Sequence, residues 1–178
     1  MMTTRVVQLL GVTSLAAVER LRGAVAETAG FEEVEASALV HLQAWPGASV
    51  GELAGVVGRS QPAAVRLVDR LVEAKLVRRE PGPDRRTVAL VVTQAGAQAA
   101  NTVLTARARA LAPMLAGLSQ RDRATLERLL GQVTAGLTED RPEAVHVCRL
   151  CDRGACRASP GCPLEPTATL GRPYPVRL

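Results

Sequence analysis

Residues 49–93 constrain the fold more than any other part of the chain, because they set four short elements in a fixed order. Two stretches with helical spacing, VGELAGVV and QPAAVRLVDRLVEAK, are separated by only Gly58, Arg59 and Ser60. The segments LVRRE and RRTVALVVT follow, with PGPD between them. A Pro-Gly-Pro-Asp turn followed by Val, Thr and Leu is typical of a β-hairpin. The sequence therefore predicts a helix, a tight turn, a second helix and a hairpin.

The two short helices carry recognisable start signals. Ser49, with Glu52 three residues later, forms the pattern of a capping box. Ser60 is expected to cap the second helix, with Pro62 in the first turn, where its missing N–H costs nothing. The predicted buried stripe of this second helix consists of Val65, Val68, Leu71 and Val72.

Longer amphipathic stretches flank this region. Apolar residues at three- and four-residue steps predict helices over about 5–29, 32–45 and 94–111. Ser119 begins a further helix. The apolar stripe of that helix is Leu126, Leu129, Leu130, Val133 and Leu137. The fold class is therefore mainly α with a small β-hairpin wing: a winged helix-turn-helix domain plus a helical domain.

Composition and motifs exclude several classes of protein. No stretch reaches the roughly 20 apolar residues of a membrane span, and VVQLLGVTSLAAV near the N-terminus lacks a convincing signal-peptide cleavage site. We therefore expect a cytoplasmic protein with reduced thiols and no membrane partner. The chain has no Gly-rich phosphate loop, no paired catalytic carboxylates and no nucleophile beside a base, so we predict that it is not an enzyme.

The charge balance favours a polyanionic partner. The chain has 22 Lys and Arg against 17 Asp and Glu, a net charge of +5, and nearly all of the cations are arginines that bind phosphates through forked hydrogen bonds. An α-helix fits the roughly 12 Å wide major groove of DNA. A hairpin tipped with arginine reaches the neighbouring phosphates or minor groove. The pattern thus favours double-stranded DNA.

The stretch GELAGVVGRSQPAAVRLVDRLVEAKLVRREPGPDRRTVALVVTQAG resembles the winged-helix core of the multiple-antibiotic-resistance regulator (MarR) family. The pieces ELA, SQPA, RLVDRL, LVRRE, DRR and VTQAG keep the order and spacing of that family, and the helix layout extends the resemblance over about residues 5–138. The resemblance implies a homodimeric DNA-binding transcriptional regulator, mostly of the repressor type, whose first and last helices form the dimer interface. It leaves a small-molecule effector possible.

Carried over by position, the resemblance implies a set of DNA-binding residues. On and before the recognition helix these are Arg59, Ser60, Gln61, Ala63, Ala64, Arg66 and Arg70. At the wing tip they are Arg85 and Arg86, with Asp84 bracing the turn. Asp69 is either a partner of a wing arginine or a plain surface residue. The sequence departs from the family at Arg59, usually apolar, at Val65, often Thr, and at Lys75, usually Gly.

The resemblance, together with the cysteine pattern after it, suggests a division of the chain. Residues 1–30 would be an N-terminal dimerisation helix, 31–93 the DNA-binding domain, 94–140 the C-terminal dimerisation helices and 141–178 a cysteine-rich metal-binding tail.

All four cysteines of the chain lie in HVCRLCDRGACRASPGCP, spaced C-x2-C-x4-C-x5-C. The predicted metal ligands are Cys148, Cys151, Cys156 and Cys162. Four thiolates suffice for a tetrahedral zinc site, and the short span is close to that of a zinc knuckle. An iron–sulfur cluster is the main alternative, and a metal-free thiol switch is a third.

The role of this segment stays open at the level of sequence. The resemblance does not cover it, so it could be a sensor, a clasp that stabilises the dimer, or a staple that only orders a tail. His146 is expected to be a bystander, and His41 a satisfied or half-buried residue. A second reading of the whole chain is a protein-interaction module, in which the winged helix is a scaffold and the cysteine tail docks a partner.

Overall fold

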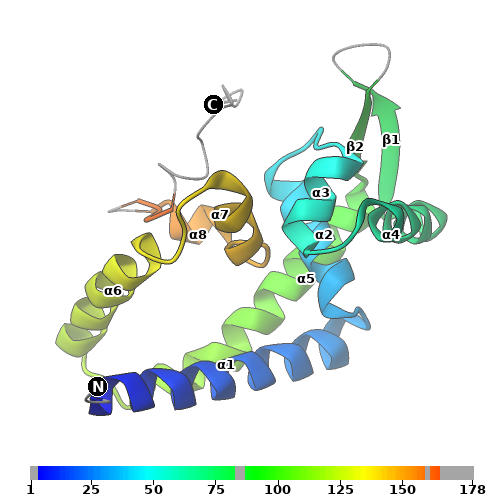
Figure 1. Cartoon of the computed structure of the whole chain (residues 1–178). Helices are drawn as coiled ribbons and strands as arrows, with labels where there is room; N and C mark the ends of the chain where they lie inside the picture. The colour runs from blue at the N-terminus through cyan, green and yellow to red at the C-terminus, as the bar shows by residue number, and fades with distance from the viewer. Residues whose placement is uncertain (1–3, 83–86, 159–160, 165–178) are drawn as a thin grey trace.

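The computed structural model describes residues 4–82, 87–158 and 161–164. The chain is mainly helical with one two-stranded hairpin, which confirms the predicted fold class (Figure 1). The elements are α1 (Arg5–Ala29), α2 (Glu33–Ala44), α3 (Val50–Val57), α4 (Gln61–Glu73), β1 (Val77–Pro81), β2 (Val88–Val92), α5 (Gln94–Leu111), η1 (Ala112–Leu115), α6 (Gln120–Ala135), α7 (Arg141–Val147) and α8 (Arg153–Cys156). Among the described residues, no helix is long and apolar enough to cross a membrane.

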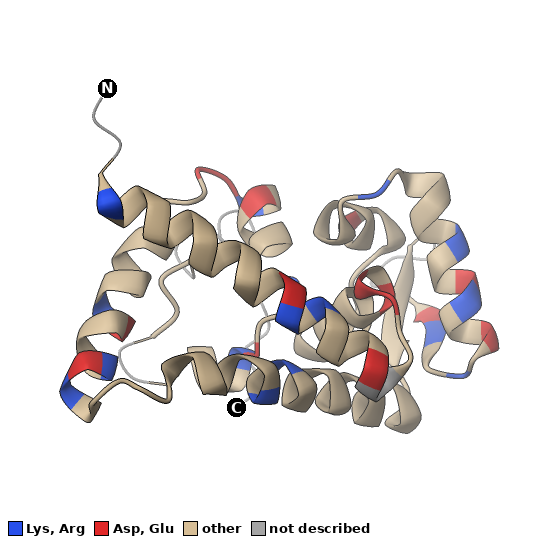
Figure 2. Cartoon of the chain, turned by 90° about the horizontal axis from the view of Figure 1, so that it is seen from below, with Lys and Arg blue, Asp and Glu red and all other residues tan. Residues whose placement is uncertain are grey.

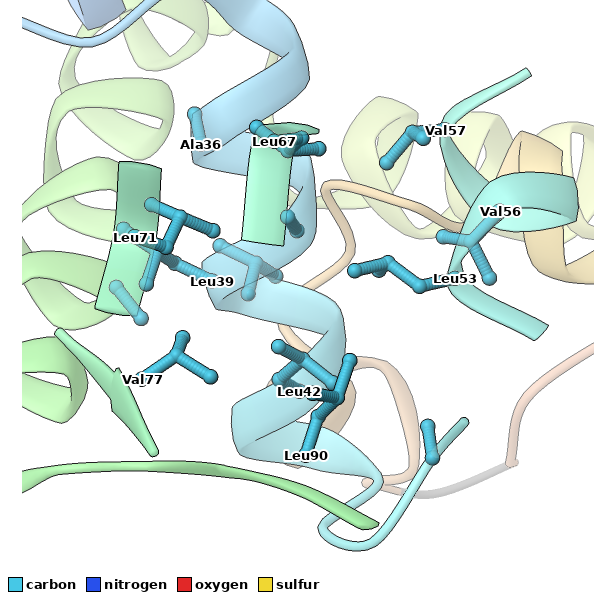
Figure 3. Packing of buried hydrophobic residues seen from close by; sticks show 14 of the residues in the cluster. Ala36, Leu39, Leu42, Leu53, Val56, Val57, Leu67, Leu71, Val77 and Leu90 are labelled. Atoms are coloured by element: carbon cyan, nitrogen blue, oxygen red, sulfur yellow. The ribbon is translucent and has the colours of Figure 1, made fainter. Parts of the chain in front are cut away.

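The core lies where α2, α3, α4 and the hairpin meet. Side chains from all of these elements converge there, as Figure 3 shows. The labelled residues that are at most 2% exposed are Ala36, Leu39, Leu42, Leu53, Val56, Leu67, Leu71, Val77 and Leu90. Burying a side chain of Leu or Val size stabilises a fold by roughly 1.5–3 kcal/mol. This shared core fixes α4 and the hairpin relative to each other.

The predicted buried stripe of α4 is wrong in phase at its N-terminal end. Ala64 is fully buried, while Val65 is 39% exposed. Leu67, Val68 and Leu71 complete the buried face. Positions 64, 67, 68 and 71 follow three- and four-residue steps, and a stripe that includes 65 would be rotated away from α2.

The hairpin is antiparallel, and its register pairs Val77 with Val92 and Pro81 with Val88. It is also attached to the chain before α3. The Leu90 N–H donates to the Ala48 carbonyl at 3.0 Å, and the Gly47 N–H donates to the Leu90 carbonyl at 2.9 Å. The wing tip, with the predicted Asp84, Arg85 and Arg86, lies outside the described residues.

The helix caps confirm part of the sequence prediction. Ser49 and Glu52 form the expected capping box, and the Ser49 hydroxyl accepts from the Glu52 N–H at 3.2 Å. Ser60 occupies the N-cap position of α4, but its side chain makes no capping hydrogen bond. Lys75 takes the left-handed backbone conformation, with φ +59°, that the family usually gives to glycine. The turn after α4 is therefore kept, at a conformational cost to a non-glycine residue.

The long helices leave the core and extend away from it. α1 lies beside α5, and α6 stands at the far end of the molecule from α4 (Figure 1). The apolar stripes on α1 and α6 are not covered by the single chain. Their exposed residues are Val6, Val7, Leu9, Leu10, Val12, Leu15, Val18, Leu129, Leu130 and Val133, and Leu137 continues the stripe just after α6; each is at least 44% exposed.

The C-terminal region is more ordered than its sequence pattern indicates. We call residues 141–158 and 161–164 the cysteine segment; it contains the helices α7 and α8. Ala144 and Leu164 are almost fully buried, and Val145 and Leu150 belong to the same apolar core as α2 and α3. The segment therefore packs on the winged-helix part of the chain rather than trailing from α6.

Candidate functional site

The outer face of α4 and the turn before it form the first candidate site. Arg59, Ser60, Gln61 and Arg66 are exposed, and Ala63 is half-buried. Within the part of the chain that the structure describes, neither Arg59 nor Arg66 forms an ion pair with an acidic side chain. The exposed N-terminal half of a helix next to two available guanidinium groups suits contact with base edges and phosphates.

Two of the predicted DNA-binding residues are placed differently. Ala64 is fully buried in the core, because it follows the buried phase of α4, so its side chain cannot line the outer face. The Arg70 Nε lies 3.3 Å from the Glu35 carboxylate, so this arginine is paired with α2. The DNA-contacting role of the remaining residues stays a prediction.

An ion pair joins α4 to the wing. The Arg79 Nη2 of β1 donates to the Asp69 carboxylate of α4 at 2.6 Å, which favours the first of the two alternatives left open for Asp69. Arg78 pairs with Glu80 within the same strand at 2.8 Å. Figure 2 shows basic and acidic positions interspersed at the end of the molecule where α4 and the hairpin lie. An exposed pair stabilises the fold by about 1 kcal/mol at most, so the Asp69 pair mainly orients the two elements.

The second candidate site is the group of four cysteines. Cys148 is the C-cap residue of α7, and the Cys151 N–H donates to its carbonyl at 2.8 Å. Asp152 caps α8 through its side chain, and Cys156 is the last residue of that helix. All four thiols are partly buried and none is in a disulfide. The turn between α7 and α8 thus gathers residues that are far apart in an extended chain.

The side chains of the four cysteines form a row of neighbours, Cys162, Cys156, Cys151 and Cys148, which we call the thiol relay. Interaction with Cys151 lowers the pKa of Cys148, whereas interaction with Cys148, together with burial, raises the pKa of Cys151. Burial is the main cause that raises the pKa of Cys156 and of Cys162. Cys148 is consequently the thiol that ionises first.

A cation from another element faces this relay. Arg107 of α5 lies near enough to act on Cys148, Cys151 and Cys156, and its charge favours their thiolate forms. All four cysteines line an open cavity of about 1570 Å³, whose other walls come from α1, α5 and α6. The cluster therefore sits between the winged-helix part and the long helices.

The cluster has the donor chemistry of a metal site without its geometry. Among the described residues, no group of three or more His, Cys, Asp or Glu side chains is arranged to hold a metal ion. Every pair of the four thiols nevertheless interacts electrostatically. Four soft sulfur donors beside an arginine suit zinc or iron. A metal would have to draw the relay into a cage.

His146 has a partner that no sequence pattern indicates. Its Nδ1 lies 2.8 Å from the Val56 carbonyl at the end of α3, a structural contact outside the cysteine site. The two residues are 90 positions apart. Gly58 shares this contact, since a Cβ built there would lie 2.9 Å from the His146 ring. No local spacing signal predicts such a contact.

Arginines of the cysteine segment make further contacts to α2. The Arg149 Nη2 lies 2.7 Å from the Glu33 carboxylate, which also accepts from Arg22 of α1 at 2.8 Å. The Arg153 Nη1 donates to the Ala44 carbonyl at 3.2 Å, and its guanidinium lies 4.7 Å above the Trp45 ring. The segment is thus held along α2 as well as α3.

His41 lies behind this contact. It is 4% exposed and stacks on Trp45 with ring centroids 4.6 Å apart. Burial lowers the pKa of His41 to about 4. Its Nδ1 has no hydrogen-bond partner among the described residues, so the histidine is buried but not fully satisfied.

Comparison with known proteins agrees with this geometry. Residues 29–87, from the end of α1 to the start of the second strand, match the model of the MarR family. This stretch of the chain is similar to the MarR-family domain. MarR-family transcriptional regulators are DNA-binding proteins without enzymatic activity, in line with the prediction that the chain is not an enzyme. No curated protein matches the sequence significantly.

Solved structures extend the likeness beyond the MarR-family domain. RV1404 from Mycobacterium tuberculosis is 25% identical with a TM-score of 0.66, over 78% of this chain and 98% of that chain. A MarR family protein from Bacillus stearothermophilus is 24% identical with a TM-score of 0.68, over 78% of this chain and 100% of that chain. Wild-type MarR from E. coli, in its apo form, is 22% identical with a TM-score of 0.60, over 75% and 98%. The family match itself ends before the cysteine segment.

Proposed function

We propose that the chain is a homodimeric, sequence-specific DNA-binding transcriptional repressor. The observation that carries this proposal is the outer face of α4, where Arg59 and Arg66 are exposed in a MarR-family domain. The Asp69–Arg79 pair orients α4 against the wing. In the proposed complex, the N-terminal half of α4 enters the major groove and the wing contacts the flanking backbone. Binding over a promoter would block transcription.

The uncovered helices support the dimer. In Figure 1, α6 and the start of α1 lie far from α4, and the apolar stripes of these two helices would face the same stripes on a second copy. A two-fold dimer presents two copies of α4, which read half-sites about one helical turn, or roughly 34–36 Å, apart. MarR-family regulators respond to small-molecule effectors, and the cavity bounded by α1, α5 and α6 is where we place such a ligand.

A mobility-shift titration on the protein's own upstream DNA tests the DNA-binding proposal. Arg66→Ala should weaken binding and flatten its salt dependence by about 0.9 per lost phosphate contact, or about twice that for a dimer. Arg109→Ala is the matched control, because it removes an equally exposed arginine from α5, away from α4. Equal salt slopes for the two variants would contradict the assignment of the α4 face. Failure of the parent dimer to bind DNA would favour the interaction-module alternative.

We further propose that the four cysteines bind zinc in this regulator, with an iron–sulfur cluster as the alternative occupant. The mutual proximity of the thiols and the position of Arg107 support a soft metal. The test is a metal count with an absorption spectrum on anaerobically purified protein. A colourless protein with one zinc per chain supports zinc, a brown protein containing iron supports the cluster, and a metal-free protein refutes both.

A further inference from the structure

The outer face of α4 carries one aliphatic side chain that the fold does not bury. Val65 is 39% exposed, and in α4, which lies wholly within the described residues, it is the only valine or leucine that is exposed. Its neighbour Ala64 takes the core position and is fully buried. The methyl groups of Val65 are therefore free to contact a partner that approaches α4 from outside.

The surroundings of Val65 are those of the proposed DNA-reading face. Gln61 and Asp69 lie one helical turn before and after it, on the same row of the helix surface. Asp69 accepts from Arg79 of the wing at 2.6 Å, so this row runs toward the hairpin. The next residue, Arg66, is exposed and forms no ion pair within the described part of the chain. An apolar group thus stands between polar side chains that suit DNA.

The position of Val65 is fixed by what lies around it. Ala64 and Val68 beside it are both fully buried in the core, and the Asp69–Arg79 pair holds the following turn against the wing. A valine in a helix also has one strongly preferred side-chain rotamer. Contact through Val65 therefore costs little conformational entropy, in contrast to contact through a long arginine.

The chemistry of the major groove decides what such a group can read. Its base edges present hydrogen-bond donors and acceptors, and the one apolar group among them is the 5-methyl group of thymine. A valine can neither donate nor accept a hydrogen bond, so a polar base edge pressed against it would lose water without a replacement. At the base pair that Val65 faces, thymine is consequently the base that fits.

We propose that Val65 is a specificity-determining residue that contacts the 5-methyl group of one thymine in each operator half-site. This inference rests on the proposed DNA-binding function and adds a preferred base to it. Burial of one methyl group is worth about fourfold in affinity. A dimer that reads two half-sites makes the contact twice, so the total effect is about fifteen-fold.

The test compares the protein's own upstream DNA prepared with thymine and the same fragment prepared with uracil throughout. Uracil pairs with adenine as thymine does but lacks the 5-methyl group. Fluorescence anisotropy with the full-length protein should show binding to uracil DNA that is about fifteen-fold weaker. Val65→Ala should bind both fragments alike, about as weakly as the parent binds uracil DNA. Val65→Thr keeps the branched shape with one methyl group fewer and should give an intermediate ratio.

Arg66→Ala is the matched control on the same turn of α4. It should weaken binding to both fragments by the same factor and keep the parent's thymine-to-uracil ratio, because a phosphate contact does not sense the methyl group. A second experiment replaces single thymines by uracil, one at a time, across the region that the protein protects. The loss should concentrate at one thymine in each half-site and vanish in Val65→Ala.

The outcomes separate this inference from the proposed function. If the parent binds neither fragment, the proposed function fails. If it binds both equally well, or if Val65→Ala keeps the full ratio, the DNA-binding function stands and the thymine contact is overturned. A loss spread evenly over many thymines would indicate readout of DNA shape and would also overturn it. Should Val65→Ala fail to fold by circular dichroism, Val65→Thr takes its place, and an undiminished ratio in Val65→Thr would overturn the contact.

Discussion

The two ends of the molecule differ in whether their apolar residues are buried. At the winged-helix end, leucines such as Leu39, Leu42 and Leu53 are completely buried within one chain. At the other end, Leu129 and Leu130 of α6 are almost half exposed although their spacing along the helix is equally regular. Exposed apolar stripes of this size mark interaction surfaces. The difference indicates that the winged-helix part buries its apolar residues within a single copy, and it supports the proposal that the long helices pair with a second copy.

The same chemical change at the two ends should have different consequences. Leu39→Ala leaves a cavity in the closed core and should lower the free energy of unfolding by about 2–5 kcal/mol. Leu130→Ala removes the same atoms from the open face, so its effect should depend on protein concentration. Urea unfolding at two concentrations, with sedimentation to follow the dimer, separates the two behaviours. A concentration-independent loss in Leu130→Ala as large as that in Leu39→Ala would break the comparison.

Local sequence signals predicted the DNA-reading end well. The Ser49–Glu52 capping box and the Asp69–Arg79 pair both depend on residues close in sequence, and each is present. The phase of α4 was harder, because Val65 and Ala64 both extend the apolar pattern and only tertiary packing decides that Ala64 is buried. The docking of the cysteine segment could not be predicted, since His146 meets Val56 across 90 residues.

The winged-helix end also contains a buried titratable group, His41. His41 is buried and its pKa is lowered to about 4, and the charges that act on it are those of Glu52, Arg141 and Arg153. Because the folded protein disfavours the charged ring, the unfolded chain binds a proton more readily below pH 6.5. Stability contributed by neutral His41 is therefore complete above that pH and is lost as the pH falls toward 4.

As the pH falls from about 7 to 5, His41 should lower the free energy of unfolding by about 2 kcal/mol. His41→Phe keeps an aromatic ring against Trp45 but has no proton to gain, so its stability should vary less over that interval. Urea unfolding at a series of pH values measures the difference. The idea is wrong if both proteins lose the same stability between pH 7 and pH 5.

The smallest expected effect concerns the turn that leads from α4 to the wing. Lys75 has φ +59°, and its N–H donates to the Val72 carbonyl at 2.9 Å to close the helix. The left-handed conformation costs a residue with a Cβ roughly 1–2 kcal/mol, and glycine does not have this cost. Part of the gain from glycine is lost, because glycine makes the unfolded chain more flexible. Lys75→Gly should therefore raise the free energy of unfolding by up to about 1 kcal/mol.

Lys75→Ala is the matched control, because it removes the same charge and keeps the Cβ. It should show no such gain in stability, and a gain in both variants would point to the charge instead. Because the side chain is exposed and lies after the last turn of α4, operator affinity should stay unchanged in either variant.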